Sequence, residues 1–366
     1  VPSVDKSVVN VVNFKSGKEE SKLIALTGTV GKTSTKKIVS TLLEGNSRVG
    51  HSKSNMAYGV LKRNYMVSGF DYKLFEVSAH ALNFSENIVK PDVAILTSIG
   101  EGHAEKYGTM ESIFEIKSKL LSSLTEGGVA VVNRDIPFFD RVKGKLANGV
   151  KLITYGEASD ADVKLVDYNP QQNKVIASLY KEEVEFCLGL SGKHNAINAI
   201  GAIAVMSALG YSYTSYSGLF STLAPVKGRG VIHKLYLNGK NFKVIDDCYN
   251  ANPLSMKASI ESFSNLDYGD GRKIMVLGDM LELGERSKHY HDALLESINS
   301  SQVDKVYLVG GAVGDLWSKL NPEIRGAALT KYNQVFPLLR RDMKDGDTIL
   351  MKSSNSIGLT KLVNSL

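Results

Sequence analysis

Short apolar runs and longer amphipathic stretches follow one another along most of the chain, which is the pattern of strands and helices in alternation. Strands are expected in the first part of the chain at Lys22–Leu26, Lys73–Val77, Asp92–Thr97 and Gly128–Val132. Helices are expected there at Lys32–Leu43, Met110–Leu124, Phe138–Ala147 and His194–Leu209. This alternation predicts an α/β fold, in which a doubly wound parallel sheet carries helices on both faces.

The stretch Ala161–Leu188 breaks the alternation, because it holds three short runs of alternating polarity separated by turn residues. These runs predict a small antiparallel extension of the sheet. Proline, lysine and two glycines cluster at Pro225–Gly230, and alternation resumes beyond them. Strands are expected there at Phe242–Asp246, Lys273–Leu277, Val303–Val309 and Thr348–Met351. Two domains are therefore expected, a central one at residues 1–226 and a Rossmann-like one at residues 227–366.

Composition and charge limit the kinds of partner and the cellular compartment that fit this chain. The 366 residues carry a net charge of +6, from 44 basic and 38 acidic residues scattered along the chain. Such a mild excess is consistent with an anionic substrate and argues against nucleic acid as a partner. No apolar run is long enough to span a bilayer, so no membrane association is expected. The two cysteines, Cys187 and Cys248, indicate no disulfide framework and fit the reducing cytoplasm.

The most specific motif lies between the first expected strand and the first expected helix, where residues 27–34 read T-G-T-V-G-K-T-S. Glycines in such a loop let backbone N–H groups approach phosphates, and the lysine reaches the terminal phosphates. Leu26 stands where the longer G-x-x-x-x-G-K-[ST] motif has its first glycine. The residues expected to bind ATP here are Gly28, Thr29, Gly31, Lys32, Thr33 and Ser34. The alternative is a surface turn with a solvated lysine.

The shortened loop T-G-T-x-G-K-T resembles the ATP loop of the Mur ligases and the folylpolyglutamate synthetases. Further segments resemble Mur ligase motifs in the same order along the chain. They are Phe75–Ser78, Leu96–Ile99 with Gly102–His103, Glu115–Lys117, Val132–Asp135, and Gly192–Asn195 with Asn198–Ala199. The resemblance covers roughly residues 21–366, and the ordered set is more specific than any single motif. It implies a P-loop ATPase domain followed by a Rossmann-like C-terminal domain.

The second half of the chain resembles one branch of the family, the ligases that add D-alanyl-D-alanine. Residues 245–253 read I-D-D-C-Y-N-A-N-P, and residues 277–284 read L-G-D-M-L-E-L-G with His291 beyond them. Both segments resemble motifs of that branch. Two other segments depart from it, since Lys352–Asn355 replaces the usual K-G-S and Val77–His80 is closer to the diaminopimelate- or lysine-adding branch. These departures leave both substrates open.

The resemblance implies an ATP-dependent ligase that joins a carboxylate to an amine through an acyl-phosphate, with Mg²⁺ as a second cofactor. It implies catalytic roles for Lys32, His103 and Lys117. It also implies Mg²⁺ binding by Thr33, Glu76, His103 and Lys117, the last as a carbamate because an ammonium is no ligand for a cation. Each residue has a plain structural interpretation as well. Glu76 can cap a helix, His103 can be an exposed loop residue, and Lys117 can be an ordinary surface lysine.

The remaining site residues follow from their positions and from the same resemblance. Nucleotide contacts are expected from Asn195, Arg229, Asp246 and Asn252. Asp246 ends a strand, where open α/β sheets bind ligands, whereas Asn195 can equally cap the helix that begins there. The amine substrate, an amino acid or a short peptide, is expected near Asp279, Glu282, His291 and Lys352. The first three of these can equally form a local hydrogen-bonded turn.

Residues 1–20 precede the first expected strand and are too few for the domain that grips the UDP-sugar in the Mur ligases. The chain as given is therefore expected to bind UDP-N-acetylmuramoyl peptides poorly, with an acyl substrate that is small or presented by another domain or a partner chain. Three alternatives stay open: a D-alanyl-D-alanine-adding ligase whose first domain is not on this chain, a P-loop kinase or GTPase, and a non-enzymatic assembly factor of Mur shape. Retention of Lys32, Glu76 and His103 argues against the last.

Overall fold

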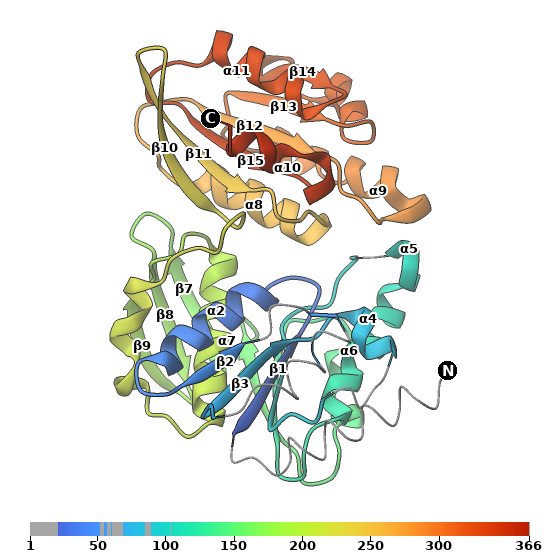
Figure 1. The fold of residues 1–366 in the computed structure, drawn as a ribbon, viewed down its shortest axis with the longest axis vertical. Coiled ribbons are helices and arrows are strands. Elements are labelled where there is room, and N and C mark those ends of the chain that lie inside the picture. The colour runs from blue at the N-terminus through green and yellow to red at the C-terminus, as the bar shows by residue number, and fades with distance from the viewer. Residues whose placement is uncertain are drawn as a thin grey trace. The chain divides into compact units, whose positions relative to one another are not determined.

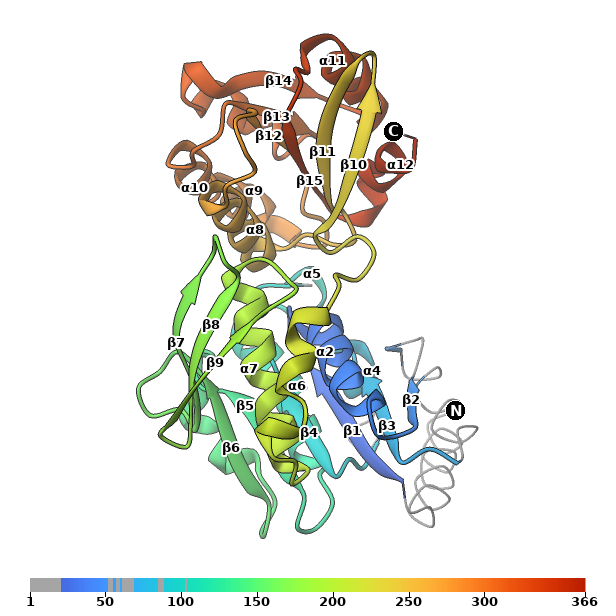
Figure 2. The ribbon, with the colours of Figure 1, turned by 90° about the vertical axis from the view of Figure 1, so that its left-hand side faces the viewer.

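The computed structural model describes residues 21–51, 55–56, 60, 69–84, 89–102 and 104–365 of the chain. These residues form two compact units, and Figures 1 and 2 show that each is a sheet with helices on its faces. The first unit draws on residues 21–100, 109–190 and 194–224, and the second on residues 101–108, 191–193 and 225–365. Each unit has its own sheet and its own hydrophobic core.

The first unit is built on a nine-stranded sheet in the order β2-β3-β1-β4-β5-β6-β7-β8-β9. Its strands are β1 (Lys22–Thr27), β2 (Val49–His51), β3 (Tyr72–Glu76), β4 (Val93–Leu96), β5 (Val129–Asn133), β6 (Lys151–Gly156), β7 (Val163–Asn169), β8 (Lys174–Leu179) and β9 (Glu182–Cys187). Pairing is parallel from β2 through to β7, whereas β7-β8-β9 is the expected antiparallel extension. Because β1 lies between β3 and β4, its carboxyl end is in the middle of the parallel part, where open sheets bind ligands.

Helices cover both faces of the parallel part of this sheet. The helices on one face are α2 (Lys32–Glu44) and α7 (Lys193–Ala208), and those on the other are α4 (Ala79–Phe84) and α6 (Met110–Ser122). Successive residues of β1 point to opposite faces, so Ile24 and Leu26 pack with α2 while Leu23 and Ala25 pack with α6. Because β1 is buried on both faces, its sequence is a nearly continuous apolar run.

The stretch Phe138–Ala147 does not form the helix expected from its pattern. It forms two 3-10 helices, η1 (Phe139–Arg141) and η2 (Lys143–Lys145). Phe138 has a φ of 65° directly after Pro137, and the backbone N–H groups of residues 141, 142 and 145 donate to carbonyls three residues earlier. Gly144, in the middle of the stretch, disfavours an α-helix, and hydrogen bonds between residues three apart close single tight turns instead. The other 3-10 helices of this unit are η3 (Tyr213–Ser215) and η4 (Ser217–Thr222).

The second unit has a six-stranded sheet in the order β10-β11-β15-β12-β13-β14. Its strands are β10 (Val231–Leu237), β11 (Lys240–Asp247), β12 (Lys273–Gly278), β13 (Lys305–Val309), β14 (Arg325–Leu329) and β15 (Thr348–Lys352). The hairpin β10-β11 is antiparallel, and the other pairs are parallel. The expected doubly wound sheet is confirmed, and the two edge strands β10 and β14 are additions to it.

Helices lie on both faces of this second sheet as well. One core contains residues of α8 (Pro253–Asn265), α9 (Ser287–Asp292) and α10 (Leu295–Asn299), and the other contains residues of α11 (Val335–Asp342) and α12 (Leu359–Val363). Shorter elements are α5 (Ala104–Tyr107), η5 (Gly284–Arg286), η6 (Gly314–Lys319), η7 (Pro322–Ile324), η8 (Tyr332–Gln334) and η9 (Asn355–Ile357). Among the helices of the described residues, none combines the length and the apolar character that crossing a membrane requires.

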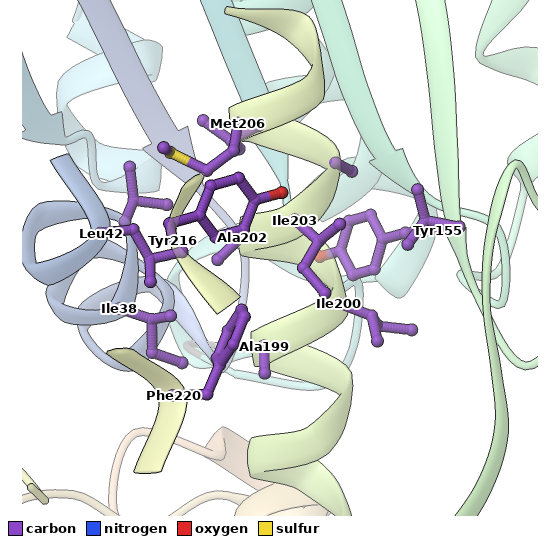
Figure 3. Packing of buried hydrophobic residues seen from close by; sticks show 14 of the residues in the cluster. Ile38, Leu42, Tyr155, Ala199, Ile200, Ala202, Ile203, Met206, Tyr216 and Phe220 are labelled. Atoms are coloured by element: carbon purple, nitrogen blue, oxygen red, sulfur yellow. The ribbon is translucent and has the colours of Figure 1, made fainter. Parts of the chain in front are cut away.

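Helix α7 packs against the sheet of the first unit at very short range. Figure 3 shows Tyr155 of β6 beside Ile200 and Ile203 of this helix. Gly201 permits that contact, because a Cβ atom there would lie 2.8 Å from Cε2 and Cζ of the tyrosine ring. The backbone of α7 therefore lies as close to the ring as a residue without a side chain allows. Since α7 also carries Asn195, this packing positions part of the expected nucleotide site.

Gly201→Ala is expected to lower the free energy of unfolding. Helix propensity alone favours alanine by about 1 kcal/mol, whereas overpacking a closed contact costs about 1–3 kcal/mol, so the loss should outweigh the gain. Urea unfolding measures the difference. Gly218→Ala is the matched control, because a Cβ atom at Gly218 meets nothing within 4 Å. A Gly201→Ala protein as stable as the wild type would contradict this, because it would show that α7 and the Tyr155 ring can move apart without a loss of folding free energy.

Candidate active site

The phosphate-loop motif connects β1 to α2, as its sequence predicted. Gly31 precedes α2 with a φ of 85°, a left-handed conformation that glycine adopts without strain. A Cβ atom at Gly31 would lie 2.7 Å from Oδ1 of Asn198, and one at Gly28 would lie 2.0 Å from Oγ1 of Thr97. Both glycines are therefore required by close approach of neighbouring segments. Lys32, Thr33 and Ser34 follow in the first turn of α2, where backbone N–H groups have no partner within the helix.

The segment after β4 holds this loop in shape. The N–H of Thr29 donates to the carbonyl of Ser98 (3.0 Å), and the N–H of Val30 donates to the Ser98 hydroxyl (2.8 Å). The Thr29 hydroxyl donates to the carbonyl of Gly100 (3.0 Å) and accepts the N–H of the same residue (3.1 Å). The loop is thus joined to the end of the neighbouring strand by a set of short bonds, so its backbone is preorganised.

Two lysines converge on one backbone oxygen of the loop. Nζ of Lys32 lies 2.5 Å from the carbonyl oxygen of Gly28, and Nζ of Lys117 lies 2.9 Å from the same atom. Lys117, on α6, is 4% exposed. Burial, and then the charge of Lys32, lower the pKa of the Lys117 ammonium well below its usual value. The site therefore concentrates positive charge and favours an uncharged amine at Lys117.

Glu76 ends β3 beside the first turn of α2. Its Oε2 accepts the Thr33 hydroxyl at 2.9 Å, and its Oε1 lies 2.6 Å from Nζ of Lys36. Burial raises the pKa of the Glu76 carboxyl, but the ammonium of Lys36 and the hydroxyl of Thr33 outweigh burial and lower it below its usual value. The carboxylate is therefore ionised at neutral pH.

This pair of oxygens suits a magnesium ion. Two oxygens bound side by side on octahedral Mg²⁺ lie about 2.8–3.0 Å apart when each metal–oxygen distance is about 2.0–2.1 Å. The Thr33 hydroxyl and the Glu76 carboxylate have that separation and are the hard oxygen donors that Mg²⁺ prefers. No cluster of three or more His, Cys, Asp or Glu side chains that could hold a metal ion is found in the described part of the chain. Of the two other expected ligands, Lys117 is described above and His103 lies outside the described residues.

Asn195 and Asn198 lie one turn apart on α7. Nδ2 of Asn198 lies 3.5 Å from Oδ1 of Asn195, and Oδ1 of Asn198 accepts the Thr35 hydroxyl of α2 at 3.3 Å. Asn198 therefore connects α7 to the helix that follows the phosphate loop. The sequence motif contained this residue, but its contact with Thr35, 163 positions away, gave no signal in the sequence.

In the second unit, Arg229 and Tyr249 form a cation–π pair. The guanidinium carbon of Arg229 lies 4.5 Å from the centroid of the Tyr249 ring, and the ring is about half exposed. Gly228 permits this contact, because a Cβ atom there would lie 3.0 Å from Cβ of Tyr249. Nε of Arg229 is buried and finds no hydrogen-bond partner in the described residues. The pair presents a cation and an aromatic face in the same place, chemistry that suits a nucleotide.

Asp246 and Asn252 flank the loop between β11 and α8. Asp246 is 1% exposed, and its Oδ1 accepts the N–H of Cys248 at 3.2 Å. Oδ1 of Asn252 accepts the N–H of Ser255 at 2.9 Å and forms a capping box at the start of α8. The cap occupies the oxygen of Asn252, so its amide N–H₂ is the group suited to a nucleobase.

Asp279 and His291 bind backbone groups of their own unit. The Asp279 carboxylate accepts the N–H groups of Gly311 (3.0 Å) and Val313 (2.7 Å). Nε2 of His291 accepts the N–H of Met280 at 3.0 Å, so Nδ1 carries the proton and donates to the carbonyl of Ser287 at 2.7 Å. Both nitrogens of this buried imidazole are therefore engaged in holding the turn after β12 against α9.

Glu282 and Lys352 complete the residues that the sequence placed near the amine. Glu282 has a φ of 63°, is exposed, and accepts the N–H of Glu105 on its carbonyl at 3.4 Å. Lys352 is 1% exposed, and its Nζ donates to Oδ2 of Asp247 (2.8 Å) and to the carbonyl of Asn250 (3.2 Å). Lys352 therefore fixes the loop between Asp246 and Asn252, an arrangement that the sequence did not indicate.

Comparison with protein families identifies both halves of the chain. Residues 26–206 match the Mur ligase middle domain. Residues 233–355 match the domain described as "Mur ligase, glutamate ligase domain". The two matched ranges together contain the phosphate loop, Glu76, Lys117, Asp246 and Asp279.

Curated relatives cover nearly the whole chain. A UDP-N-acetylmuramoyl-tripeptide–D-alanyl-D-alanine ligase of Rickettsia prowazekii (strain Madrid E) is 29% identical over 96% of this chain and 79% of its own length. The ligase of the same name from Bacillus subtilis (strain 168) is 28% identical over 94% of this chain and 76% of its own length.

Solved structures show the same fold. The MurF ligase of Thermotoga maritima in complex with ADP has a TM-score of 0.83 and 26% identity, and covers 100% of this chain and 83% of its own. MurF from Acinetobacter baumannii has a TM-score of 0.86 at 24% identity, over 99% of this chain and 80% of its own. The family matches, the relatives and the fold agree with the arrangement around the phosphate loop, and the chain therefore belongs to the Mur ligase family of ATP-dependent, amide-bond-forming ligases.

Proposed function

We propose that this protein phosphorylates a carboxylate with ATP and transfers the activated acyl group to an amine, with Lys32, Thr33, Glu76 and Lys117 at the reacting centre. The observation that carries the proposal is the convergence of the Lys32 and Lys117 side chains on the Gly28 carbonyl, beside the bonded pair Thr33–Glu76. Positive charge on a preorganised loop next to hard oxygen ligands is what transfer of a γ-phosphoryl group needs.

The reaction has two steps whose atoms balance. A carboxylate oxygen attacks the γ-phosphorus, the bond from phosphorus to the β,γ-bridging oxygen breaks, and ADP leaves. The amine then attacks the acyl carbon, inorganic phosphate leaves with the former carboxylate oxygen, and the nitrogen loses a proton. Lys32 and the loop N–H groups would neutralise charge on the transferred phosphoryl group. Mg²⁺ held by Thr33 and Glu76 would share that charge with them.

Lys117 is proposed to act as a carbamate. A neutral lysine amine can attack CO₂ to give a carbamate and release one proton, and the lowered pKa of Lys117 supplies the neutral amine. The product is an anionic oxygen donor, and His103 is proposed as its companion ligand for a second Mg²⁺. Carbon NMR with ¹³C-bicarbonate should give a carbamate resonance in the wild type that is missing in Lys117→Met. A resonance common to both proteins would exclude Lys117 as its source.

For the substrates, we propose D-alanyl-D-alanine as the amine and the carboxylate of a muramoyl tripeptide as the acyl group, in place of the small or partner-presented acyl substrate that the sequence alone suggested. Support comes from the names of the relatives, which match 94–96% of this chain. The second unit is proposed to supply nucleotide contacts through Arg229, Asp246 and Asn252, and amine contacts near Asp279, Glu282, His291 and Lys352. Support for domains at 1–226 and 227–366 is that the two family matches end and begin on either side of that boundary. An enzyme that consumes ATP is placed in the cytoplasm, where ATP is supplied.

Lys32→Ala is expected to lower kcat at least about a hundredfold, because it removes charge stabilisation that is strongest in the transition state. Phosphate release with ATP, Mg²⁺, D-alanyl-D-alanine and UDP-N-acetylmuramoyl tripeptide measures it, with each substrate omitted in turn. Lys37→Ala is the matched control, since Lys37 lies on the same helix and is exposed. Phosphate release that is independent of the amine would contradict a ligase, and normal turnover by Lys32→Ala would remove the loop from the mechanism.

Lys117→Met is expected to be slower than the wild type and more stable at neutral pH. In CO₂-free buffer the folded-state pKa of Lys117 is well below the ordinary 10.5, so below pH 10.5 the unfolded chain binds a proton that the native chain does not. Wild-type stability therefore gains from Lys117 as pH rises toward 10.5, and the methionine variant should lack that slope. Urea unfolding at several pH values tests this against Lys119→Met on the same helix. Equal slopes in both variants would contradict a buried, uncharged Lys117.

A further inference from the structure

The motif at the end of β5, Asn133-Arg134-Asp135, has no part in the chemistry described so far. In the sheet of the first unit, β1, β4, β5 and β6 are neighbours in that order, and all four run parallel. Their carboxyl ends therefore lie along one edge of the sheet, with the phosphate loop at the end of β1. Hydrogen bonds between successive strand ends form a continuous row along this edge.

Asn133 is the middle member of the row. Its side chain is nearly buried, with 9% of the residue exposed. Nδ2 donates to the carbonyl of Thr97 at 3.1 Å, and Oδ1 accepts the N–H of Asp135 at 2.9 Å. A flipped amide would place its oxygen against the Thr97 carbonyl and its N–H₂ against the Asp135 N–H. An aspartate would place an oxygen against the Thr97 carbonyl. The position requires asparagine in this orientation.

Asp135 fixes the far end of the row. Its two carboxylate oxygens accept the N–H groups of Glu157 (2.6 Å) and Ala158 (2.9 Å), directly after β6. Gly156 makes room for it, since a Cβ atom there would lie 2.4 Å from Oδ2 of Asp135. The Asp135 backbone N–H that binds Asn133 is therefore held in place, because the Asp135 carboxylate is bonded to the end of β6.

Thr97 carries the row to the phosphate loop. Thr97 is 4% exposed, and its hydroxyl donates to the carbonyl of Val30 at 2.6 Å. The Ser98 hydroxyl donates to the same carbonyl at 3.0 Å. In a trans peptide the C=O and the next N–H point in opposite directions. Holding the Val30 carbonyl toward β4 therefore turns the N–H of Gly31 away from β4, which orients one donor of the loop.

We propose that Asn133 and Thr97 are positioning residues that set the peptide between Val30 and Gly31 in the orientation that binds nucleotide phosphate. Asn133 acts through the backbone of Thr97, and Thr97 acts through its hydroxyl. The inference rests on the proposed function, because it assumes that the loop binds a nucleotide. Neither residue touches the reacting atoms. Their loss weakens nucleotide binding more than it disturbs the fold, since the surrounding sheet is held by its own ladder.

The test is the Kd for Mg·ADP, measured by titration calorimetry, beside the melting temperature of the same proteins. Thr97→Val removes the hydroxyl at nearly constant volume, and Asn133→Asp replaces the donor with an acceptor. Each should raise the Kd about tenfold, the value of one hydrogen bond of about 1.4 kcal/mol. Thr97→Ser keeps the hydroxyl and should bind within about twofold of the wild type. The Kd of the double variant should be about equal to that of the weaker-binding single variant, because both changes break the same row of hydrogen bonds.

Asn169→Ala is the control for a merely structural asparagine. Asn169 accepts the N–H groups of Gln171 and Gln172 in the β7–β8 turn, so its loss should lower the melting temperature and leave the Kd unchanged. If Thr97→Val and Asn133→Asp behave in the same way, with normal Kd, the inference is overturned while the proposed function stands. If the wild type itself fails to bind Mg·ADP, the proposed function and the inference are both overturned.

Discussion

An anion-binding loop has to point N–H groups at its ligand and keep its own carbonyl oxygens occupied elsewhere. The phosphate loop of this protein meets that constraint residue by residue. The Gly28 carbonyl accepts Lys32 and Lys117, and the Val30 carbonyl accepts the hydroxyls of Thr97 and Ser98. The loop therefore needs donors from two other segments before it can hold a phosphate. The segment after β4 supplies two hydroxyls, and α6 supplies the Lys117 side chain.

Satisfying the loop carbonyls has an electrostatic consequence. Burial of Lys117 lowers the pKa of its ammonium group, and repulsion by the Lys32 ammonium on the same oxygen lowers it further. A buried uncharged lysine lowers stability, so the fold retains Lys117 at a thermodynamic cost. The second unit handles its buried lysine differently, because Lys352 is matched by the carboxylate of Asp247. The contrast supports the carbamate role proposed for Lys117, whereas Lys352 holds the shape of a loop.

Much of the architecture could be read from hydrophobic periodicity, since strands such as β1 are apolar on both faces and helices such as α2 follow a glycine-rich loop. Periodicity failed at Phe138–Ala147, where hydrogen bonds between residues three apart close 3-10 turns in place of an α-helix. The phosphate loop could be placed because its chemistry lies within eight consecutive residues, 27–34. The bonds of Asn133 and Asn198 could not, because their partners are 36 and 163 positions away. Asn252 was expected only as a nucleotide contact, and the cap it forms at the start of α8 was not predicted, although Asn-Pro followed by Ser255 is a helix-start pattern.

The central claim is that ATP activates a carboxylate as an acyl-phosphate, and the path of one oxygen atom tests it most directly. UDP-N-acetylmuramoyl tripeptide labelled with ¹⁸O in its reacting carboxylate is converted with ATP, Mg²⁺ and D-alanyl-D-alanine, and the products are analysed by mass spectrometry. The mechanism predicts one ¹⁸O atom in each inorganic phosphate released and one in the new amide. Amide formation with label in AMP, or with unlabelled phosphate, would contradict it.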